Sequence, residues 1–426
     1  MVVLVAAAAL VPLCGKGTPT AAAEVLPLPP YVNTTAFSGH GDLAFVSLGD
    51  LYVLDGASGH FVNVTGAALA ASGPEFSPDG KWLTYETDYQ GEISWLARAD
   101  GLGSKRLAGT ATWLPNGQLA LSSPASISTF TVSNNEALLR TGGSAQASAV
   151  KAGSSVVYLF VTQTLEVQPT KSSHGVERVE TAASPGGRRT LWYQAPVSFS
   201  PPGGLQGNFV GNVSVLPGQG GLLLTISHYC CDYADGQDFY ELRTPLGQPR
   251  LLGPVLNGSA LPTLGPSGTF AFEGGGDRYA WVSKHVEQCV EATATCTRVP
   301  APENELSVSP AWSPNGQTLA FVEASAEPEG AIGQSQVLRW YATRHLYLLL
   351  AGSGRPVEVA HTQGAAAPVW SENSRSLLFV DDDALYLIAQ PGAAPVEVAG
   401  PLFSPGSWSG YFGEIAWTRQ FAWSQS

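Results

Sequence analysis

Short runs of alternating apolar and polar residues, separated by turns rich in glycine and proline, fill most of this chain. One unit, Pro74–Thr87, reads PEFSPDGKWLTYET, and another, Pro310–Glu323, reads PAWSPNGQTLAFVE. Each places an aromatic residue before a tight Ser-Pro-Asp-Gly or Ser-Pro-Asn-Gly turn and an alternating run after it. Alternation with a period of two is typical of a half-buried β-strand. The pattern therefore predicts two antiparallel strands joined by a tight turn in each unit.

The same sequence motif, called the repeated phrase below, recurs along the chain at intervals of roughly 35 to 65 residues. Its eight copies begin at Ala36, Glu75, Thr112, Ala149, Ser214, Thr263, Ala311 and Val369. Many copies are followed by a third and a fourth apolar run, as in Asp50–Gly56 and His60–Gly66. Repeats of this length with four strands each are typical of a β-propeller, whose sheets stack around an axis. We therefore expect an all-β fold built from four-stranded antiparallel blades.

The eight phrases predict eight blades in a single domain over residues 31–426. The stretch near residues 165–190 is long and polar, which indicates an exposed insertion. If that unit and its neighbour share one sheet, the number of blades is seven. The aromatic tail Tyr411–Ser426 alternates like a strand, and we expect it to pair with the N-terminal blade and close the ring. A docked, irregular tail is the alternative.

The sequence motif of these repeats resembles the TolB-like, WD-type propeller repeat of bacterial envelope proteins. That repeat combines a Trp-Ser-Pro-Asp-Gly turn with a later Leu-Tyr-Val strand. The matching segments are Phe76–Gly80, Trp312–Gly316, Trp370-Ser371, Leu51–Val53, Leu346–Leu348 and Leu385–Leu387. The resemblance covers most of 36–400 and implies protein partners in the cell envelope. It transfers no partner-binding residue to this chain, and one fold supports many functions.

The N-terminus begins with the uninterrupted apolar run Val2–Leu13. This run is too short to span a bilayer comfortably and suits the apolar core of a secretory signal. Residues 1–23 are therefore expected to be a signal segment, cleaved after Ala21–Ala23. Lipidation at Cys14 is the alternative to cleavage. If the protein is not exported, the apolar run is instead a strand or an irregular tail. We expect a periplasmic, cell-surface or extracellular protein with no transmembrane segment.

The charge of the chain limits the kinds of molecule that it is expected to bind. The net charge is −13 and only 21 Lys and Arg are spread over the chain, which argues against a nucleic-acid ligand. No cluster of basic residues of the kind that binds anionic lipids is present in the sequence.

Four cysteines remain if Cys14 belongs to the signal. An even number suits disulfide bonding in an oxidising compartment. Cys289 and Cys296 flank six residues that fit a strand–turn–strand clip, so this pair is the favoured disulfide. Cys230 and Cys231 are then either a vicinal disulfide or two free thiols. A zinc site is the rival hypothesis, but the cysteine spacing does not favour it.

The most unusual local stretch is His228–Leu242, HYCCDYADGQDFYEL. Its carboxylates Asp232, Asp235 and Asp238 are weak candidates for calcium ligands, although their spacing does not match a known calcium loop. A rigid loop that contacts a partner and an ordinary hairpin turn are the other interpretations. Apart from calcium here, we expect no cofactor.

Other polar and aromatic residues have structural interpretations. Asp381–Asp383 is expected to form a solvated turn, although a carboxylate triplet is also able to hold a cation. Asp79 is expected to form its turn. The repeat aromatics are expected to pack between blades; they are Phe76, Trp113, Trp312 and Trp370. The sequence contains no nucleophile elbow and no phosphate or dinucleotide loop, so no catalytic residue is predicted.

Three functions fit this sequence. The leading hypothesis is an exported, non-enzymatic propeller that acts as a protein-binding or scaffold module of the cell envelope. The second is a structural component of a surface assembly. The third is a propeller enzyme of the lyase or glycosidase type, with a site in the central channel.

Overall fold

In a computed structural model, the regular structure of the described residues is almost entirely β-strand. The structure describes residues 29–66, 70–87, 93–123, 126–132, 138–144, 148–152, 155–163, 171–184, 187–200, 204–216, 220–229, 236–255, 262–265, 268–276, 283–293, 295–301, 305–326, 339–402 and 417–425. None of the helices in these ranges is long and apolar enough to cross a membrane.

The strands of the described ranges form seven antiparallel sheets. One four-stranded sheet contains, in pairing order, β33 (Phe421–Ser424), β2 (Asp42–Ser47), β3 (Asp50–Asp55) and β4 (Phe61–Asn63). The next contains β5 (Ala71–Phe76), β6 (Trp82–Thr87), β7 (Ile93–Arg98) and β8 (Ser104–Arg106). A third contains β9 (Thr110–Trp113), β10 (Leu119–Ser123), β11 (Ser126–Val132) and β12 (Leu138–Ser144). Two more are β21 (Thr263–Leu264), β22 (Thr269–Gly274), β23 (His285–Val290), β24 (Thr295–Arg298); and β25 (Glu305–Trp312), β26 (Thr318–Ser325), β27 (His345–Leu350), β28 (Val357–Glu358).

The other two sheets are larger. A five-stranded sheet contains β29 (Ala365–Trp370), β30 (Leu377–Asp381), β31 (Ala384–Ile388), β32 (Val396–Gly400) and β1 (Tyr31–Val32). An eight-stranded sheet contains β13 (Ser148–Ala152), β14 (Ser155–Gln163), β15 (Ser173–Ala182), β16 (Thr190–Ser200), β17 (Gly204–Val215), β18 (Leu222–Tyr229), β19 (Gln237–Leu242) and β20 (Arg250–Val255).

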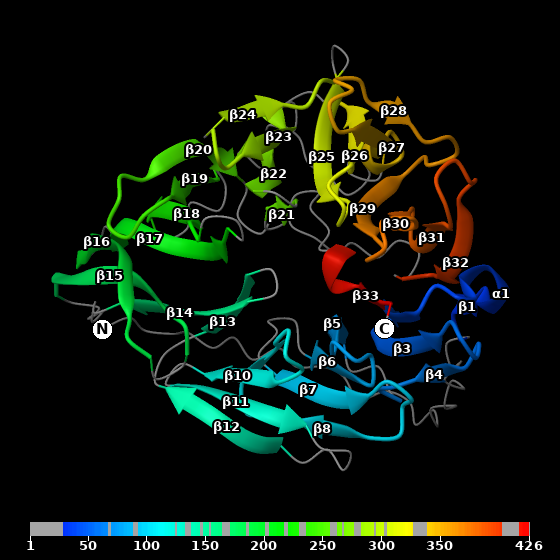
Figure 1. Cartoon of the computed structure of the whole chain (residues 1–426), viewed down its shortest axis with the longest axis horizontal. Helices are drawn as coiled ribbons and strands as arrows, with labels where there is room; N and C mark the ends of the chain where they lie inside the picture. The colour runs from blue at the N-terminus through cyan, green and yellow to red at the C-terminus, as the bar shows by residue number, and fades with distance from the viewer. Residues whose placement is uncertain are drawn as a thin grey trace, which may run out of the picture.

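The sheets follow one another around a common centre in chain order (Figure 1). First strands such as β5, β21 and β29 lie toward the middle, and last strands such as β8, β24 and β28 lie at the rim (Figure 1). This arrangement is that of a β-propeller. The stretch near 165–190, expected to be an exposed insertion, includes β15, which pairs with both β14 and β16.

The repeated phrase forms the turn between the first and second strands. Ser77 Oγ accepts a 3.0 Å hydrogen bond from the Trp82 amide and donates one of 2.7 Å to Asp79, as expected of a turn-forming aspartate. Ser313 makes the same pair of bonds with the Thr318 amide and Asn315. Gly80, with φ 69°, supplies the left-handed conformation that this turn needs.

The two ends of the described chain pair with sheets at the opposite end of the sequence. β33 pairs with β2 through Phe421–Phe45 and three further residue pairs, where a C-terminal strand was predicted. At the other end, β1 pairs with β32. One expectation was wrong: Phe37, expected to end a strand, lies in the short helix α1 (Thr34–Phe37), because β33 occupies the first-strand position of that sheet.

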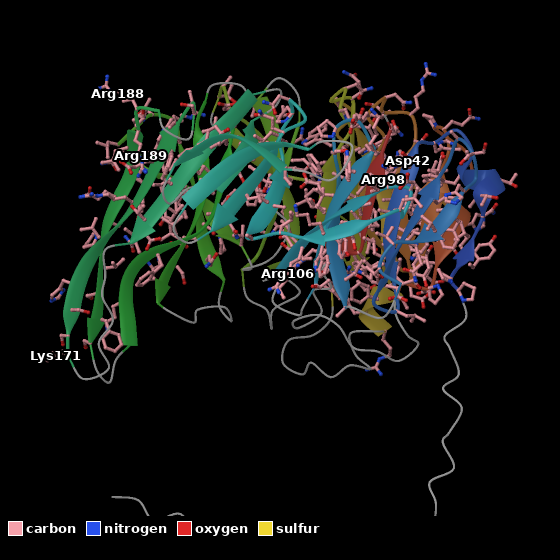
Figure 2. The ribbon with its side chains drawn as sticks, turned by 90° about the horizontal axis from the view of Figure 1, so that it is seen from below. Asp42, Arg98, Arg106, Lys171, Arg188 and Arg189 are labelled. Carbon is pink, nitrogen blue, oxygen red and sulfur yellow. A yellow bond between two sulfur atoms is a disulfide. The ribbon has the colours of Figure 1, made fainter. Side chains whose placement is uncertain are left out.

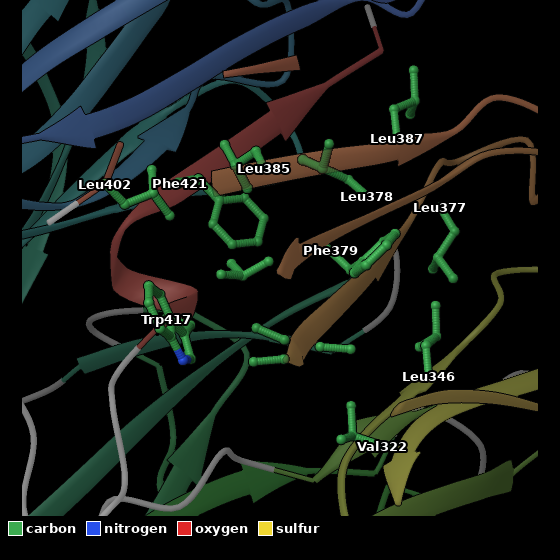
Figure 3. Packing of buried hydrophobic residues seen from close by; sticks show 14 of the residues in the cluster. Val322, Leu346, Leu377, Leu378, Phe379, Leu385, Leu387, Leu402, Trp417 and Phe421 are labelled. Atoms are coloured by element: carbon green, nitrogen blue, oxygen red, sulfur yellow. The ribbon is translucent and has the colours of Figure 1, made fainter. Parts of the chain in front are cut away.

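Apolar side chains fill the spaces between neighbouring sheets. Four sheets carry the same stacked or tilted cross-strand aromatic pair; these are Phe45–Tyr52, Tyr85–Trp95, Phe321–Tyr347 and Phe379–Tyr386. The largest apolar cluster joins β25–β28, β29–β32 and β2–β3 to the C-terminal residues Trp417 and Phe421 (Figure 3). Of the repeat aromatics, Phe76, Trp113 and Trp312 are buried and Trp370 is partly buried. Burial of this kind is the main force that holds the sheets together.

Candidate functional site

The sheets have two chemically different ends. At the turn end, first strands connect to second strands and third strands to fourth strands. At the loop end, second strands lead to third strands, and each sheet leads to the next. Asp42, Arg98 and Arg189 belong to the turn end and lie toward one side of the molecule, whereas Lys171 belongs to the loop end and lies on the opposite side (Figure 2).

Carboxylates at the turn end are mostly satisfied by local donors. Asp55 accepts hydrogen bonds from the Ala57 amide and from the amide and hydroxyl of Ser58, and the hydroxyl bond is the main cause of its lowered pKa. The pKa of Asp100 is lowered chiefly by its hydrogen bonds from Arg98. Burial raises the pKa of Asp79, but hydrogen bonds from Ser77 and Lys81 outweigh it and leave the pKa lowered. These carboxylates are therefore held in the charged form.

Glu323, in β26, shows the opposite behaviour at the loop end. Its side chain is buried, with 2% of the residue exposed. Burial, followed by the nearby charge of Glu305, raises the pKa of Glu323 to about 8. Tyr347, on the neighbouring strand β27, has a raised pKa because of burial and the charge of Glu323. His345 Nδ1 lies 3.3 Å from Glu358 Oε1 at the exposed side of the same group.

A second group of carboxylates lies at the loop end of the next sheet. Burial and the charge of Asp382 raise the pKa of Asp381 to about 7. The pKa of Asp383 is raised for the same two reasons. The three form the turn between β30 and β31 that the sequence predicted, with Asp382 exposed at φ 53°. Asp381 and Asp382 also crowd Gly364, where an added Cβ would lie 2.9 to 3.0 Å from their carboxylates.

Three of the cations at the loop end are engaged with neighbouring residues, whereas Lys171, at the same end, is exposed. Arg419 donates a 2.6 Å hydrogen bond to Glu86, and Lys284 Nζ lies 3.8 Å from Glu273 Oε1 in a buried pair. The buried guanidinium of Arg344 stacks against two aromatic rings, 4.1 Å from the centroid of Trp340 and 3.8 Å from that of Tyr341. Glu305 and Glu358 lie beside Glu323, and Asp382 lies beside Asp381, so carboxylates gather at these two places of the loop end.

The stretch HYCCDYADGQDFYEL contributes a hydrogen-bonded group at the same end. His228 Nε2 lies 3.0 Å from Asp238 Oδ2, and the Tyr240 hydroxyl donates a 3.0 Å bond to the same oxygen. His228 Nδ1 lies 2.9 Å from Asn208 Oδ1. Burial, and then the bond to Asp238, raise the pKa of Tyr240 to about 12. Both ring nitrogens of the half-exposed His228 are thus engaged, which fixes its orientation.

The remaining predicted site residues have different outcomes. The predicted disulfide between Cys289 and Cys296 is present and clips β23 to β24. Asp232, Asp235, Cys14, Cys230 and Cys231 lie outside the described residues, as does the signal segment. Within the described ranges, no three His, Cys, Asp or Glu side chains are grouped so as to hold a metal ion.

The sequence reasoning did not identify Glu323. A signal was present, because the alternating run LAFVE ends in Glu323 where the matching run LAFVS ends in Ser47. An acidic residue at the end of a buried strand is unusual, since burial of an unpaired carboxylate is unfavourable. The proximity of Glu305 and Tyr347 arises only from the pairing of β25, β26 and β27.

Comparison with known proteins identified no matching family model and no matching curated protein. Among solved structures, the β-propeller domain of the trilobed protease from Pyrococcus furiosus is 11% identical, with a TM-score of 0.38, covering 72% of this chain and 88% of its own. Oligogalacturonate lyase from Vibrio parahaemolyticus is 11% identical, with a TM-score of 0.44 and coverages of 84% and 97%. A putative TolB from Agrobacterium tumefaciens is 12% identical, with a TM-score of 0.35 and coverages of 84% and 90%.

Proposed function

We propose that this protein is an exported β-propeller that binds a positively charged protein partner of the cell envelope at its loop end. We propose a ring of eight four-stranded units that β33 closes. In it, β13–β16 and β17–β20 count as two units although they share one eight-stranded sheet, the arrangement for which the sequence predicted seven blades. The N-terminal segment, whether cleaved or lipidated at Cys14, directs the export.

The observation that supports this function is that carboxylates with raised pKa values gather at the loop end, with Asp42 as the exception at the turn end. Turn-end carboxylates such as Asp79 and Asp100 have lowered pKa values because donors surround them. Loop-end carboxylates such as Glu323 and Asp381 have raised pKa values because burial and like charges surround them. A carboxylate that is destabilised in the free protein gains most when a cation arrives, since the cation removes the repulsion. Perturbed groups of this kind cluster at functional sites.

A capture experiment tests this function. The tagged protein is cross-linked in the envelope fraction of its own cells, and captured proteins are identified by mass spectrometry. We expect one stoichiometric partner whose surface is basic, and a double variant Glu323→Gln and Asp381→Asn should retain less of it. The matched control is Glu372→Gln, which removes one negative charge from an exposed turn at the other end. Recovery of the tagged protein alone would instead support a homotypic surface assembly.

An enzyme is the second candidate, and Glu323 is the observation that favours it. A carboxyl with a pKa of about 8 carries a proton at neutral pH, as the general acid of a glycosidase or lyase does. This reading predicts turnover of a polysaccharide or chromogenic glycoside that is abolished by Glu323→Gln. Turnover that is unchanged in this variant would exclude Glu323 as the acid.

A further inference from the structure

A groove of about 500 Å³ opens at the turn end between the sheet of β2–β4 and the sheet of β5–β8. Asp42 and Asp55 line one side of it, and Lys81, Trp82 and Arg98 line the other. Asp42 and Arg98 lie next to each other in the view of Figure 2. A volume of this size is within the range of about 300 to 1,000 Å³ that is typical of small-molecule sites.

The packing of neighbouring sheets accounts for the presence of the groove, but it does not account for the charged residues that line it. A second groove of about 490 Å³ lies at the same end between the sheet of β29–β32 and that of β2–β4. Its lining is mostly glycine, serine, alanine and amide side chains, with Glu372 and Arg375 as its Lys, Arg, Asp or Glu residues. Packing of neighbouring blades thus produces the hollow, and particular side chains give one hollow a distinct charge.

Asp42 and Asp55 lie directly opposite each other on the paired strands β2 and β3. Like charges in this relationship destabilise a sheet. Two other sheets place uncharged pairs at this register position, and a third pairs Trp82 with Arg98; the uncharged pairs are Thr318–Leu350 in β26–β27 and Thr269–Val290 in β22–β23. The fold therefore does not require two carboxylates here, and their presence calls for another explanation.

Alternation along the two strands directs this acid pair into the groove. Ala44 and Val46 on β2, and Leu51 and Val53 on β3, pack against the sheet of β5–β8. Asp42 lies two residues before Ala44 on the same face of β2, so its carboxylate continues that face toward the turn end. Burial, and then the charge of Asp55, raise the pKa of Asp42.

The cations on the other side already have acidic partners. Arg98 donates hydrogen bonds of 2.9 and 3.2 Å to Asp100 and lies 5.9 Å from the ring centroid of Trp82. Lys81 lies 3.4 Å from Asp79 in an exposed pair. Asp55 is also occupied, because it accepts bonds from the amide and hydroxyl of Ser58.

Asp42 differs from these groups. It is half-buried, and among the described residues its carboxylate has no hydrogen-bond or ion-pair partner. The groove is lined by the carboxylates Asp42, Asp55 and Asp100 and by the cations Lys81 and Arg98, with His60 beside Asp55. With neutral His60, its excess charge is negative and lies on the side of the Asp42–Asp55 pair.

We propose that this groove binds a small organic amine whose ammonium group donates hydrogen bonds to Asp42 and neutralises the Asp42–Asp55 pair. An ammonium has three donors on a compact charge, which suits one open carboxylate beside a second one. The same pair offers fewer donors than a calcium ion takes, because calcium binds six to eight oxygens. This binding lies at the turn end and does not depend on the partner proposed for the loop end.

Isothermal titration calorimetry with 1,4-diaminobutane as the probe tests this site on the full chain. We expect saturable binding at one site, and about tenfold weaker binding for Asp42→Asn, because a charge-assisted hydrogen bond is lost. Glu372→Gln, in the second groove, should bind as the unaltered protein does. The uncharged analogue 1,4-butanediol should not bind.

Three results of the titration would count against an amine site in this groove. No binding of the diamine, equal binding by Asp42→Asn, or equal binding of the diol would overturn the proposal. Displacement of the diamine by calcium chloride at equal concentration would replace it with a metal site. If Asp42→Asn does not fold, Lys81→Gln is the second variant, and it should bind the diamine about threefold more tightly because a nearby positive charge is removed. Weaker or unchanged binding by Lys81→Gln would contradict the proposal.

Discussion

Arg419 donates a 2.6 Å hydrogen bond to the carboxylate of Glu86, although 333 residues separate the two along the chain. The same guanidinium donates a 3.1 Å bond to Ser72. Arg419 ends the 3₁₀ helix η3 (Trp417–Arg419), which lies near the middle of the ring of sheets (Figure 1). The C-terminal residues therefore join the sheet of β5–β8 to the sheet that contains β33.

The first prediction concerns this C-terminal strand. Phe421 is buried in the largest apolar cluster, so Phe421→Ala should lower the free energy of unfolding by about 3 to 5 kcal/mol. Denaturant unfolding measures the change. Ser424→Ala, on the same strand but only partly buried, is the control and should have a much smaller effect. Equal losses in both variants would mean that backbone pairing alone, without the Phe421 side chain, holds this strand.

The second prediction concerns the repeated turn. Ser313→Ala removes the acceptor for the Thr318 amide, and Ser313 is 1% exposed, so water does not replace it. The free energy of unfolding should fall by about 1 to 2 kcal/mol. Ser353→Ala, in an exposed turn of the same sheet, should change it by less than about 0.5 kcal/mol. If the two variants unfold alike, the serine does not organise this turn.

The third prediction is a pH dependence. The pKa of Glu323 is raised to about 8 in the folded protein, from 4.5 as its ordinary value. The folded state therefore binds this proton more tightly, so the contribution of Glu323 is fully favourable below about pH 4.5 and is lost as the pH rises toward 8. Glu323→Gln should remove up to one proton from the slope of stability against pH in this window. The same measurement on Glu372→Gln is the control, and a slope that Glu323→Gln leaves unchanged would refute the assignment.

The fourth prediction uses the disulfide. Cys289 and Cys296 are seven residues apart, and closing so short a loop stabilises a protein by about 2 to 3 kcal/mol. A reducing agent should lower the stability of the unaltered protein by this amount but leave the double variant Cys289→Ser and Cys296→Ser unaffected. A further loss in the double variant would show that another cystine also contributes to stability.

The fifth prediction concerns the hydrogen-bonded group around His228. After burial, Asp238 is the next cause of the raised pKa of Tyr240. Asp238→Asn should therefore lower the pKa of Tyr240 from about 12 toward its ordinary value of 10. Ultraviolet titration of tyrosinate measures this, with Tyr240→Phe identifying the transition that belongs to Tyr240. A transition that stays in place in Asp238→Asn would contradict the contact.

The sequence predicted what depends on neighbouring residues. The Ser77–Asp79 turn and the disulfide between Cys289 and Cys296 both arise within about ten residues, where propensity and turn chemistry dominate. The expectation of a half-buried strand was wrong for β2, because neighbouring apolar clusters pack on both of its faces and bury Leu43–Ser47. The tail Tyr411–Ser426 was predicted to pair with the N-terminal blade, because a ring of sheets leaves edges that need a partner. Within this tail, Phe421–Ser424 pairs with β2.

Other features that depend on distant pairing were not predicted. Phe37 lies in a helix because a strand from the far end of the chain takes its place in the sheet. The carboxylates of Glu305 and Glu323 interact only once β25 pairs with β26. Likewise, the opposition of Asp42 and Asp55 depends on the register of β2 and β3, which a turn of two residues sets.

The central claim is that the loop end receives a positively charged partner. Zero-length carbodiimide cross-linking tests it most directly, because this reagent joins carboxylates to lysines in contact with them. Mass spectrometry of the cross-linked envelope fraction should place the linkages on loop-end carboxylates such as Asp382 and Glu305, joined to lysines of one partner. Linkages confined to turn-end carboxylates such as Asp79 and Asp100, or only between copies of this chain, would contradict the account.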